Sequence, residues 1–403
     1  MEFSNLRKYE DMLYSCSRVG DCRVSVRPSI GKYGVCPVLE HSPGFEVYFA
    51  RGRILLARGL LEGKIKPTEE VVRVFYQCMV CGSCKWSCNQ SFEESVVLPI
   101  SQIIDHDKIW EAIRADFVEM GIGPMPRHRE ILAWTRKEYN PYPPSKHADR
   151  LKWIPEGEKI PQKGKIVFFV GCTNPYRAPD LLIKYLELMR AAGVEVAINP
   201  DLWCCGSIAL RVGDRKLGEE LARHNVEVLK NIGAEVVVTH CAGCYRTLKR
   251  DYPEIVGELP FEVKHTTEHL LELIKDGKLH PEKELKYKVT YHDPCHLGRH
   301  CGVFDPPREV IRSVPGIEFT ELRRIRYNSW CCGAGGGVKS AFPDLAVKIA
   351  KDRIKETTEV KADTLVTACP FCERNLTDAV NAMKSRVRVL DVIDLVHEST
   401  ITK

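Results

Sequence analysis

Two adjacent pairs of cysteines, each followed by glycine, constrain this chain more than any other feature. The first pair is Cys204-Cys205, the second is Cys331-Cys332, and each is the centre of a five-cysteine pattern. Corresponding cysteines of the two patterns lie 123 to 128 residues apart, and the patterns take ten of the 18 cysteines. This regularity indicates an internal duplication, in which each copy must fold so that five thiols meet.

Each pattern consists of a leading cysteine, the adjacent pair and a closing C-x2-C motif. The first comprises Cys172, Cys204, Cys205, Cys241 and Cys244, and the second comprises Cys295, Cys331, Cys332, Cys369 and Cys372. Neighbouring residues seldom direct both sulfurs to one tetrahedral ion, and five thiols exceed the ligand number of structural zinc or of a cubane cluster. The excess of thiols indicates a larger metal cluster of unusual shape.

The duplicated part also has the pattern of a parallel α/β fold. Short apolar runs end just before cysteine-containing segments, at 165–170, 235–239, 287–292 and 363–367. Helical patterns separate these runs, which is typical of parallel sheets. Because such sheets bind ligands beyond the carboxyl ends of their strands, we expect the sulfurs at the mouth of each sheet, outside the core.

A different cysteine motif precedes the duplication. Cys78, Cys81, Cys84 and Cys88 follow the spacing C-x2-C-x2-C-x3-C, which is that of bacterial ferredoxins that bind [4Fe–4S] clusters. A zinc knuckle is the alternative, but zinc has no need of the third cysteine at this spacing. The motif therefore predicts a cubane cluster.

A second ferredoxin-like motif at the N-terminus is incomplete. Cys16 and Cys22 have the separation of the first and third positions, but Val19 stands at the middle position. This site could hold a [4Fe–4S] cluster with a non-cysteine ligand such as Asp21, a [3Fe–4S] cluster, or none. The alternative for these two cysteines is that they are buried small residues.

In two-cluster ferredoxins the fourth cysteine of each motif binds the other cluster. Applied here, this exchange predicts two ligand sets, which are Cys36, Cys78, Cys81 and Cys84, and Cys16, Cys22 and Cys88.

The remaining composition is that of an ordinary globular protein. Lys plus Arg number 59 and Asp plus Glu 54, and a formal net charge of +5 gives no reason to expect nucleic-acid binding. No apolar run approaches the roughly 20 residues that span a bilayer, and the first residues lack the apolar core of a signal peptide. We therefore expect a cytoplasmic protein that reaches the membrane only through a partner, with reduced, metal-binding cysteines.

These observations predict an α+β multidomain chain. We expect a mainly helical ferredoxin-type domain at 1–105, a Pro-rich linker or wrapping segment at 106–164, and two repeated α/β domains with parallel sheets at 165–286 and 287–403.

With the motif HDPCHLG at 292–298, the two cysteine-pair repeats and the ferredoxin-like section resemble the iron–sulfur oxidoreductases of the heterodisulfide reductase catalytic subunit family. The stretch RGRILLARGLLEG at 51–63 is also similar to the iron–sulfur subunit of glycolate oxidase. The first resemblance implies CCG domains in which each five-cysteine set binds a noncubane [4Fe–4S] cluster. It also implies that a disulfide is cleaved between the two clusters. His292 and His296 are then candidate proton donors, whereas a histidine beside a cluster more often hydrogen-bonds sulfur.

Two functions remain open at this point. One is a disulfide reductase that receives electrons through ferredoxin-type clusters. The other is an electron-transfer subunit of a larger complex, whose partner is a flavoprotein, a cytochrome b, a hydroxy-acid dehydrogenase or an aromatic-ring reductase. The sequence has no flavin or nicotinamide motif, so either function requires a partner in a hetero-oligomeric complex. A zinc protein without redox activity would explain the C-x2-C pairs but not the adjacent pairs.

Overall fold

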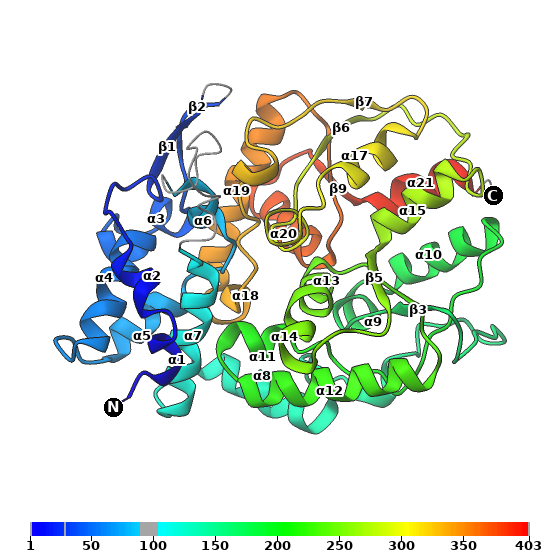
Figure 1. The fold of residues 1–403 in the computed structure, drawn as a ribbon. Helices are drawn as coiled ribbons and strands as arrows, with labels where there is room; N and C mark the ends of the chain where they lie inside the picture. Colours follow the sequence, from blue (N-terminus) through cyan, green and yellow to red (C-terminus); the bar gives the residue numbers. More distant parts are fainter. Residues whose placement is uncertain (1, 28–29, 89–103, 402–403) are drawn as a thin grey trace.

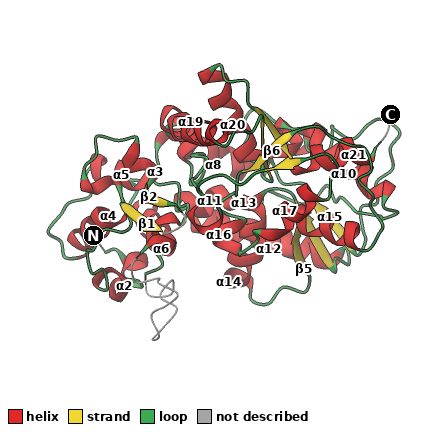
Figure 2. Cartoon of the chain, turned by 90° about the horizontal axis from the view of Figure 1, so that it is seen from above, coloured by secondary structure: helices red, strands yellow, loops and turns green. Residues whose placement is uncertain are grey.

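The computed structural model describes residues 2–27, 30–88 and 104–401 (Figure 1). A helical N-terminal region lies at one end of the molecule, and two α/β units with separate sheets form the rest, as the view from above also shows (Figure 2). No helix among the described residues is long and apolar enough to cross a membrane.

The N-terminal region consists of short helices and one hairpin. Its elements are α1 (Ser4–Arg7), α2 (Glu10–Tyr14), β1 (Val24–Arg27), β2 (Gly31–Gly34), α3 (Pro37–Glu40), α4 (Ala50–Leu61), α5 (Glu69–Tyr76), α6 (Ser83–Ser87) and α7 (His106–Glu119). The next helix, α8 (Pro126–Glu138), lies beside the α/β units (Figure 1). Strands β1 and β2 pair antiparallel. In the core, the ring of Phe75 packs against those of Trp110 and Phe117, with centroids 5.9 and 5.7 Å away.

The first α/β unit has a three-stranded parallel sheet in the order β3-β4-β5. Its elements are β3 (Ile166–Phe169), α9 (Thr173–Arg177), α10 (Pro179–Ala191), α11 (Ser207–Val212), α12 (Arg215–Asn231), β4 (Val236–Thr239), α13 (Ala242–Arg246), α14 (Tyr252–Val256), β5 (Glu262–His265) and α15 (Thr266–Lys275). A single parallel bridge joins Val167 to Ala197 on the other side of β3.

The second unit has a four-stranded parallel sheet in the order β7-β6-β8-β9. Its elements are β6 (Lys288–Tyr291), α16 (Gly298–Cys301), α17 (Asp305–Arg312), β7 (Glu318–Phe319), α18 (Val338–Ala341), α19 (Pro343–Glu359), β8 (Thr364–Thr367), α20 (Pro370–Met383), β9 (Arg388–Asp391) and α21 (Val392–Thr400). The bridge at Ala197 lies beside β3 at the edge of the first sheet, and β7 lies beside β6 at the same edge of the second sheet. The two units therefore share one topology, which confirms the prediction of repeated parallel α/β units.

The segment 106–164 differs from a simple linker. It contains α7 and α8, and α7 packs into the N-terminal core through Ile109, Trp110 and Ile113, which are at most 1% exposed. The Pro-rich stretch from which a linker was predicted begins only at Pro141, after both helices. Helix α7 therefore belongs to the N-terminal region, and the other domain limits stay predictions.

A buried histidine on α8 attaches this segment to the second unit and should make stability pH-dependent. His128 is fully buried and donates from Nε2 to the Gly337 carbonyl at 2.8 Å. Burial lowers the pKa of His128 to about 4. Because the folded protein keeps this ring neutral, its contribution to stability is present above the unfolded pKa of about 6.5 and is lost as the pH falls towards 4.

We expect His128→Gln, whose amide can still donate to Gly337, to remove this pH dependence. When the pH is lowered from 7.5 to 5.5, the free energy of unfolding should fall by about 1.4 kcal/mol more in wild type than in this variant. Urea unfolding at both pH values measures the difference, and His280→Gln, at an exposed position, is the control. An equal pH dependence in wild type and His128→Gln would show that His128 does not titrate in this way.

Candidate metal centres

The five cysteines of the first set come together at the carboxyl ends of β3 and β4. Cys172 directly precedes α9, and Cys241 directly precedes α13. Gly206, with a φ of 83°, turns the chain between the adjacent pair and α11. A series of thiol contacts links all five sulfurs, in the order Cys172, Cys204, Cys205, Cys244 and Cys241.

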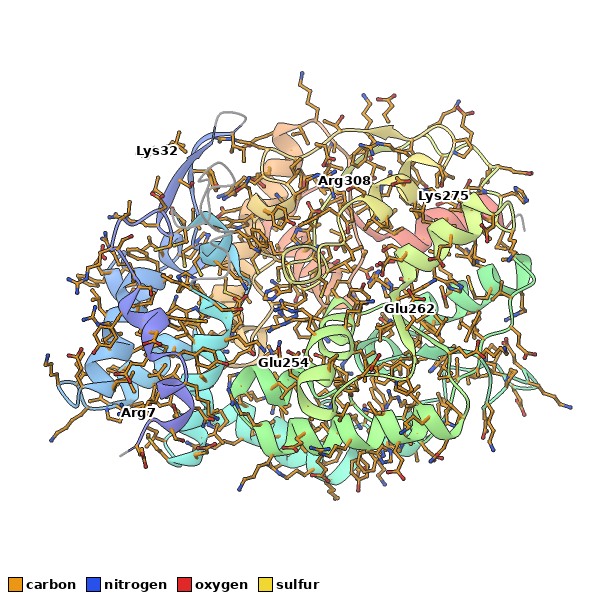
Figure 3. The ribbon with its side chains drawn as sticks, viewed as in Figure 1. Arg7, Lys32, Glu254, Glu262, Lys275 and Arg308 are labelled. Atoms are coloured by element: carbon orange, nitrogen blue, oxygen red, sulfur yellow. The ribbon has the colours of Figure 1, made fainter. Side chains whose placement is uncertain are left out.

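The second set repeats this arrangement beyond β6 and β8. Cys369 directly precedes α20 and Cys372 lies in its first turn. The thiol contacts follow the same order, through Cys295, Cys331, Cys332, Cys372 and Cys369. The loop before Cys295 is held by Asp293, whose carboxylate pairs with Arg308 at 2.7 and 2.9 Å. Arg308 lies inside this unit (Figure 3).

The two sets meet each other. The thiol of Cys369 contacts the sulfur of Cys241, so the last cysteine of one set touches the last of the other. Cys331, the second member of the second five-cysteine set, contacts Cys81 of the N-terminal region. These contacts therefore link Cys81 of the ferredoxin-like motif, through the second set, to the first set.

The sulfurs are more deeply buried than the sequence pattern predicted. Eight of the ten cysteines in the two sets are only 1–5% exposed, while Cys241 and Cys295 are half-buried. They do lie beyond the strand ends, but the N-terminal region packs against the cysteine-pair loops and excludes solvent. The expectation that they lie outside the core is therefore wrong. Within each adjacent pair one sulfur joins the core of the α/β units (Cys205, Cys332) and the other joins the N-terminal core (Cys204, Cys331).

The N-terminal cysteines line two cavities. The first cavity is bordered by Cys36, Cys78, Cys81 and Cys84. The second is bordered by Cys16, Cys22 and Cys88, together with Val19 and Asp21. The cysteines that border each cavity are those predicted from the exchange of fourth ligands. Val19, at the position of the missing cysteine, lies beside the incomplete set. Metal binding by either set stays a prediction.

The electrostatics of the sets favour thiolates at particular positions. Thiol hydrogen bonds from Cys172 and Cys205 hold the pKa of Cys204 well below its usual value, and those from Cys244 and Cys369 do the same for Cys241. Those from Cys331 and Cys372 lower the pKa of Cys332. A thiol hydrogen bond from Cys331 lowers the pKa of Cys81 to about 6. Thiolates are the form of cysteine that binds metal, so converging buried thiols of this kind fit iron–sulfur clusters.

His292 lies against the second set. The ligand atoms of His292, Cys332 and Cys372 all lie within 4.8 Å of one another. Its Nδ1 accepts from Arg353 Nε at 3.1 Å, so the neutral ring carries its hydrogen on Nε2. Burial lowers the pKa of His292, and the Cys332 sulfur opposes that effect. The ring can therefore donate towards sulfur.

His296 has a different environment, at the junction of the two sets. A Cβ placed on Gly243 would lie 3.6 Å from Cys241 Sγ and 3.9 Å from His296 Nδ1. Burial lowers the pKa of His296 well below its usual value, and its Nε2 has no hydrogen-bond partner in the described part of the chain.

Sequence reasoning missed the residues that support the cysteine loops. Asn225 donates to the Cys204 carbonyl at 3.0 Å, and Asn375 donates to the Cys332 carbonyl at 2.5 Å. Arg299 donates to the Cys81 carbonyl at 2.7 Å. Arg114 donates to the carbonyls of Cys78 and Gly336. Each acts on a main-chain carbonyl far away in sequence, and no local motif marks such a residue.

The glycine run after Cys332 has a packing role. A Cβ on Gly336, whose φ is 60°, would lie 2.8 Å from the Cys78 carbonyl oxygen, and one on Gly335 would lie 2.9 Å from that of Met79. The backbone of the ferredoxin-like loop therefore packs directly on this run, which brings Cys81 to Cys331.

Comparison with known proteins agrees with this duplicated geometry. The model of the CCG cysteine-rich domain matches residues 166–249 and 289–377, which contain the two sets. Over 399 residues, the chain is 40% identical to a Methanosarcina acetivorans protein named as a subunit of dihydromethanophenazine:CoB–CoM heterodisulfide reductase, and the match covers 96% of this chain and 94% of that protein. The chain belongs to this family of heterodisulfide reductase subunits. It is thus an oxidoreductase of an iron–sulfur protein family.

Two further likenesses are more distant. A protein of Syntrophomonas wolfei named EtfAB:quinone oxidoreductase is 31% identical over 346 residues, which are 79% of this chain and 46% of that protein. Among solved structures, a hypothetical protein from Helicobacter pylori has a TM-score of 0.56 at 11% identity, covering 92% of this chain and 71% of its own. The latter likeness concerns the fold alone.

Proposed function

We propose that this member of the heterodisulfide reductase family is the iron–sulfur subunit of a reductase that cleaves a disulfide. The N-terminal sets would hold a [4Fe–4S] cubane and a second cluster, either [4Fe–4S] or [3Fe–4S]. The two five-cysteine sets would hold noncubane [4Fe–4S] clusters. When bound, these clusters supply one-electron transfer.

The contact series of the sulfurs is the observation that carries this proposal. Cys81 touches Cys331, and Cys369 touches Cys241, so no gap separates the ferredoxin-like set from the first five-cysteine set. A chain that only passed electrons onward would have no need of two five-thiol sets packed against each other. The half-buried Cys241 and Cys295 are the members of those sets that a substrate can approach.

Cleavage of a disulfide takes two electrons and two protons and yields two thiols. We assign proton donation to His292 and His296; because burial keeps both rings neutral, each must first take up a proton and then pass it to sulfur. Arg353 fixes the hydrogen of His292 on Nε2, which faces the second set, and His296 lies beside Cys241 of the first. Both histidines are buried, which excludes bulk water, and the Arg353 hydrogen bond fixes where the proton of His292 is held.

The alternative function is electron transfer within a larger complex, without a disulfide substrate. The likeness to a quinone oxidoreductase that carries EtfAB in its name favours it, and so does Val19 at the position of a missing cysteine. In both cases the partner is a flavoprotein or a cytochrome b. We propose that the protein is cytoplasmic and reaches the membrane through that partner.

Iron and sulfide analysis with EPR, on protein purified without oxygen, tests the proposal. Four clusters require about 15 or 16 irons per chain. The protein is then oxidised with and without thiol, starting with the CoM and CoB thiols named for the relative. We expect a signal that appears only with thiol, because product sulfur then lies beside a five-cysteine set.

About eight irons with cubane signals alone would contradict the disulfide proposal and favour the electron-transfer alternative. In that case the CCG sets would be empty or structural.

A further inference from the structure

The exposed large apolar side chains of the described chain all lie near its N-terminus. They are Tyr14, Val19, Val26, Phe45 and Leu55, with exposed fractions from 39% to 69%. The α/β units, which form most of the described chain, have none that reach this exposure. Apolar surface gathered on one part of a protein marks an interaction site more often than scattered residues do.

Four of these side chains gather along α4. Leu55 lies one turn after Arg51 and one turn before Arg58, so the three share a face of the helix. The ring of Tyr14 lies under the Arg58 guanidinium, 4.2 Å from it. We call Tyr14, Val19, Phe45 and Leu55 the α4 strip.

Arg51 connects the other two members to α4. It donates to the Arg18 carbonyl at 3.0 Å, next to Val19, and it pairs with Glu46, next to Phe45, at 2.7 Å.

The α4 strip is continuous with the second N-terminal cavity. Val19 and Arg51 both border that cavity, together with Cys16 and Cys22. Figure 1 shows α2 and α4 at the end of the molecule that lies away from the two parallel sheets. Through Val19 the strip therefore borders the Cys16, Cys22 and Cys88 set.

The surface beside the strip carries basic groups that are free to meet a partner's carboxylates. Arg18 and Arg23 are exposed, and neither forms a salt bridge with any described residue. Asp21 in the same loop is half-buried, and Glu46, which pairs with Arg51, is a carboxylate whose charge acts on Arg23. Lys32 projects from the same end of the molecule, as Figure 3 shows. Such a surface attracts a partner with the opposite charge.

We propose that the α4 strip with Arg18 and Arg23 is the docking surface for an electron-transfer protein whose redox centre is rimmed by carboxylates. The apolar strip would form the dry centre of this interface and the two arginines its charged rim. The inference rests on the proposed function, because it assigns the entry point of electrons to the Cys16, Cys22 and Cys88 set.

Flavodoxin, an acidic flavoprotein, is the probe for this surface. Its dissociation constant is measured by calorimetry with the metal-loaded protein at low ionic strength. The double variant Phe45→Ser, Leu55→Ser should weaken binding about tenfold, because the centre of the interface is lost. Arg23→Glu should weaken it similarly and flatten its salt dependence. The matched control is Val26→Ser, which changes an equally exposed apolar residue on β1, outside the strip.

A second readout separates docking from the proposed function. Reduced methyl viologen is a small donor that needs no docking surface, so it should reduce the clusters of wild type and of the double variant at equal rates. Equal flavodoxin affinity in wild type and the double variant, or equal weakening in Val26→Ser, would overturn the docking proposal. Failure of methyl viologen to reduce wild-type protein would instead contradict the proposed function, and the binding constants would still decide the docking surface.

Discussion

Cys332→Ser is expected to remove the iron of the second five-cysteine set and to abolish disulfide reduction. Cys332 contacts Cys331 and Cys372, and their thiol hydrogen bonds lower its pKa, which favours the thiolate that binds metal. Iron should fall by about four per chain, and activity by more than the roughly 10–100-fold typical for loss of a residue that merely supports a ligand. Iron analysis and thiol release from the disulfide measure the two effects.

The matched control for this variant is Cys301→Ser. Cys301 is half-buried, and burial raises its pKa to about 12, but it belongs to neither set. Its replacement should leave iron and activity unchanged. The EPR signal of the ferredoxin-like set should survive in Cys332→Ser. Unchanged iron in that variant would refute Cys332 as a ligand, and loss of all EPR signals would mean that the variant fails to fold.

Arg114→Met is expected to have the largest effect on stability. Arg114 is fully buried on α7 and donates to four carbonyls, those of Phe75, Cys78, Arg211 and Gly336, at 2.6, 2.5, 2.7 and 3.0 Å. These carbonyls belong to the N-terminal region and to both α/β units. Methionine fills much of the space but donates nothing, so several buried acceptors lose their partner. We expect a loss of about 3–5 kcal/mol in the free energy of unfolding.

Thermal and urea unfolding of Arg114→Met, Arg114→Lys and Arg129→Met test this expectation. Lysine keeps the charge but not the planar fork, so it should recover only part of the loss. Arg129 is exposed on α8, and its replacement should change stability by no more than about 0.5 kcal/mol. If Arg114→Met were as stable as Arg129→Met, the three parts of the chain would be held together by other contacts.

The parts of the fold that could be predicted are those with a local signal. The apolar runs that end before Cys241 and Cys369 correctly predicted strands β4 and β8. A buried parallel strand can be recognised from its own run of apolar residues, without knowledge of the strands that pair with it. Helices α7 and α8 were not predicted, because the Pro-rich stretch that follows them has the typical sequence of a linker and the whole segment was assigned from it. Cys36 was grouped with Cys78, Cys81 and Cys84 because the fourth cysteine of each ferredoxin motif binds the other motif's cluster. These four residues do border one cavity.

The sequence by itself determined which cysteines belong together, because ligand spacing and strand ends are properties of short segments. Only the tertiary structure decided the order of the sets, since the contacts Cys81–Cys331 and Cys241–Cys369 join residues that are far apart in the chain. It also decided their burial. Whether a strand end is open to solvent depends on what packs over it, and here Arg114 and the glycines after Cys332 hold the N-terminal region against the second five-cysteine set.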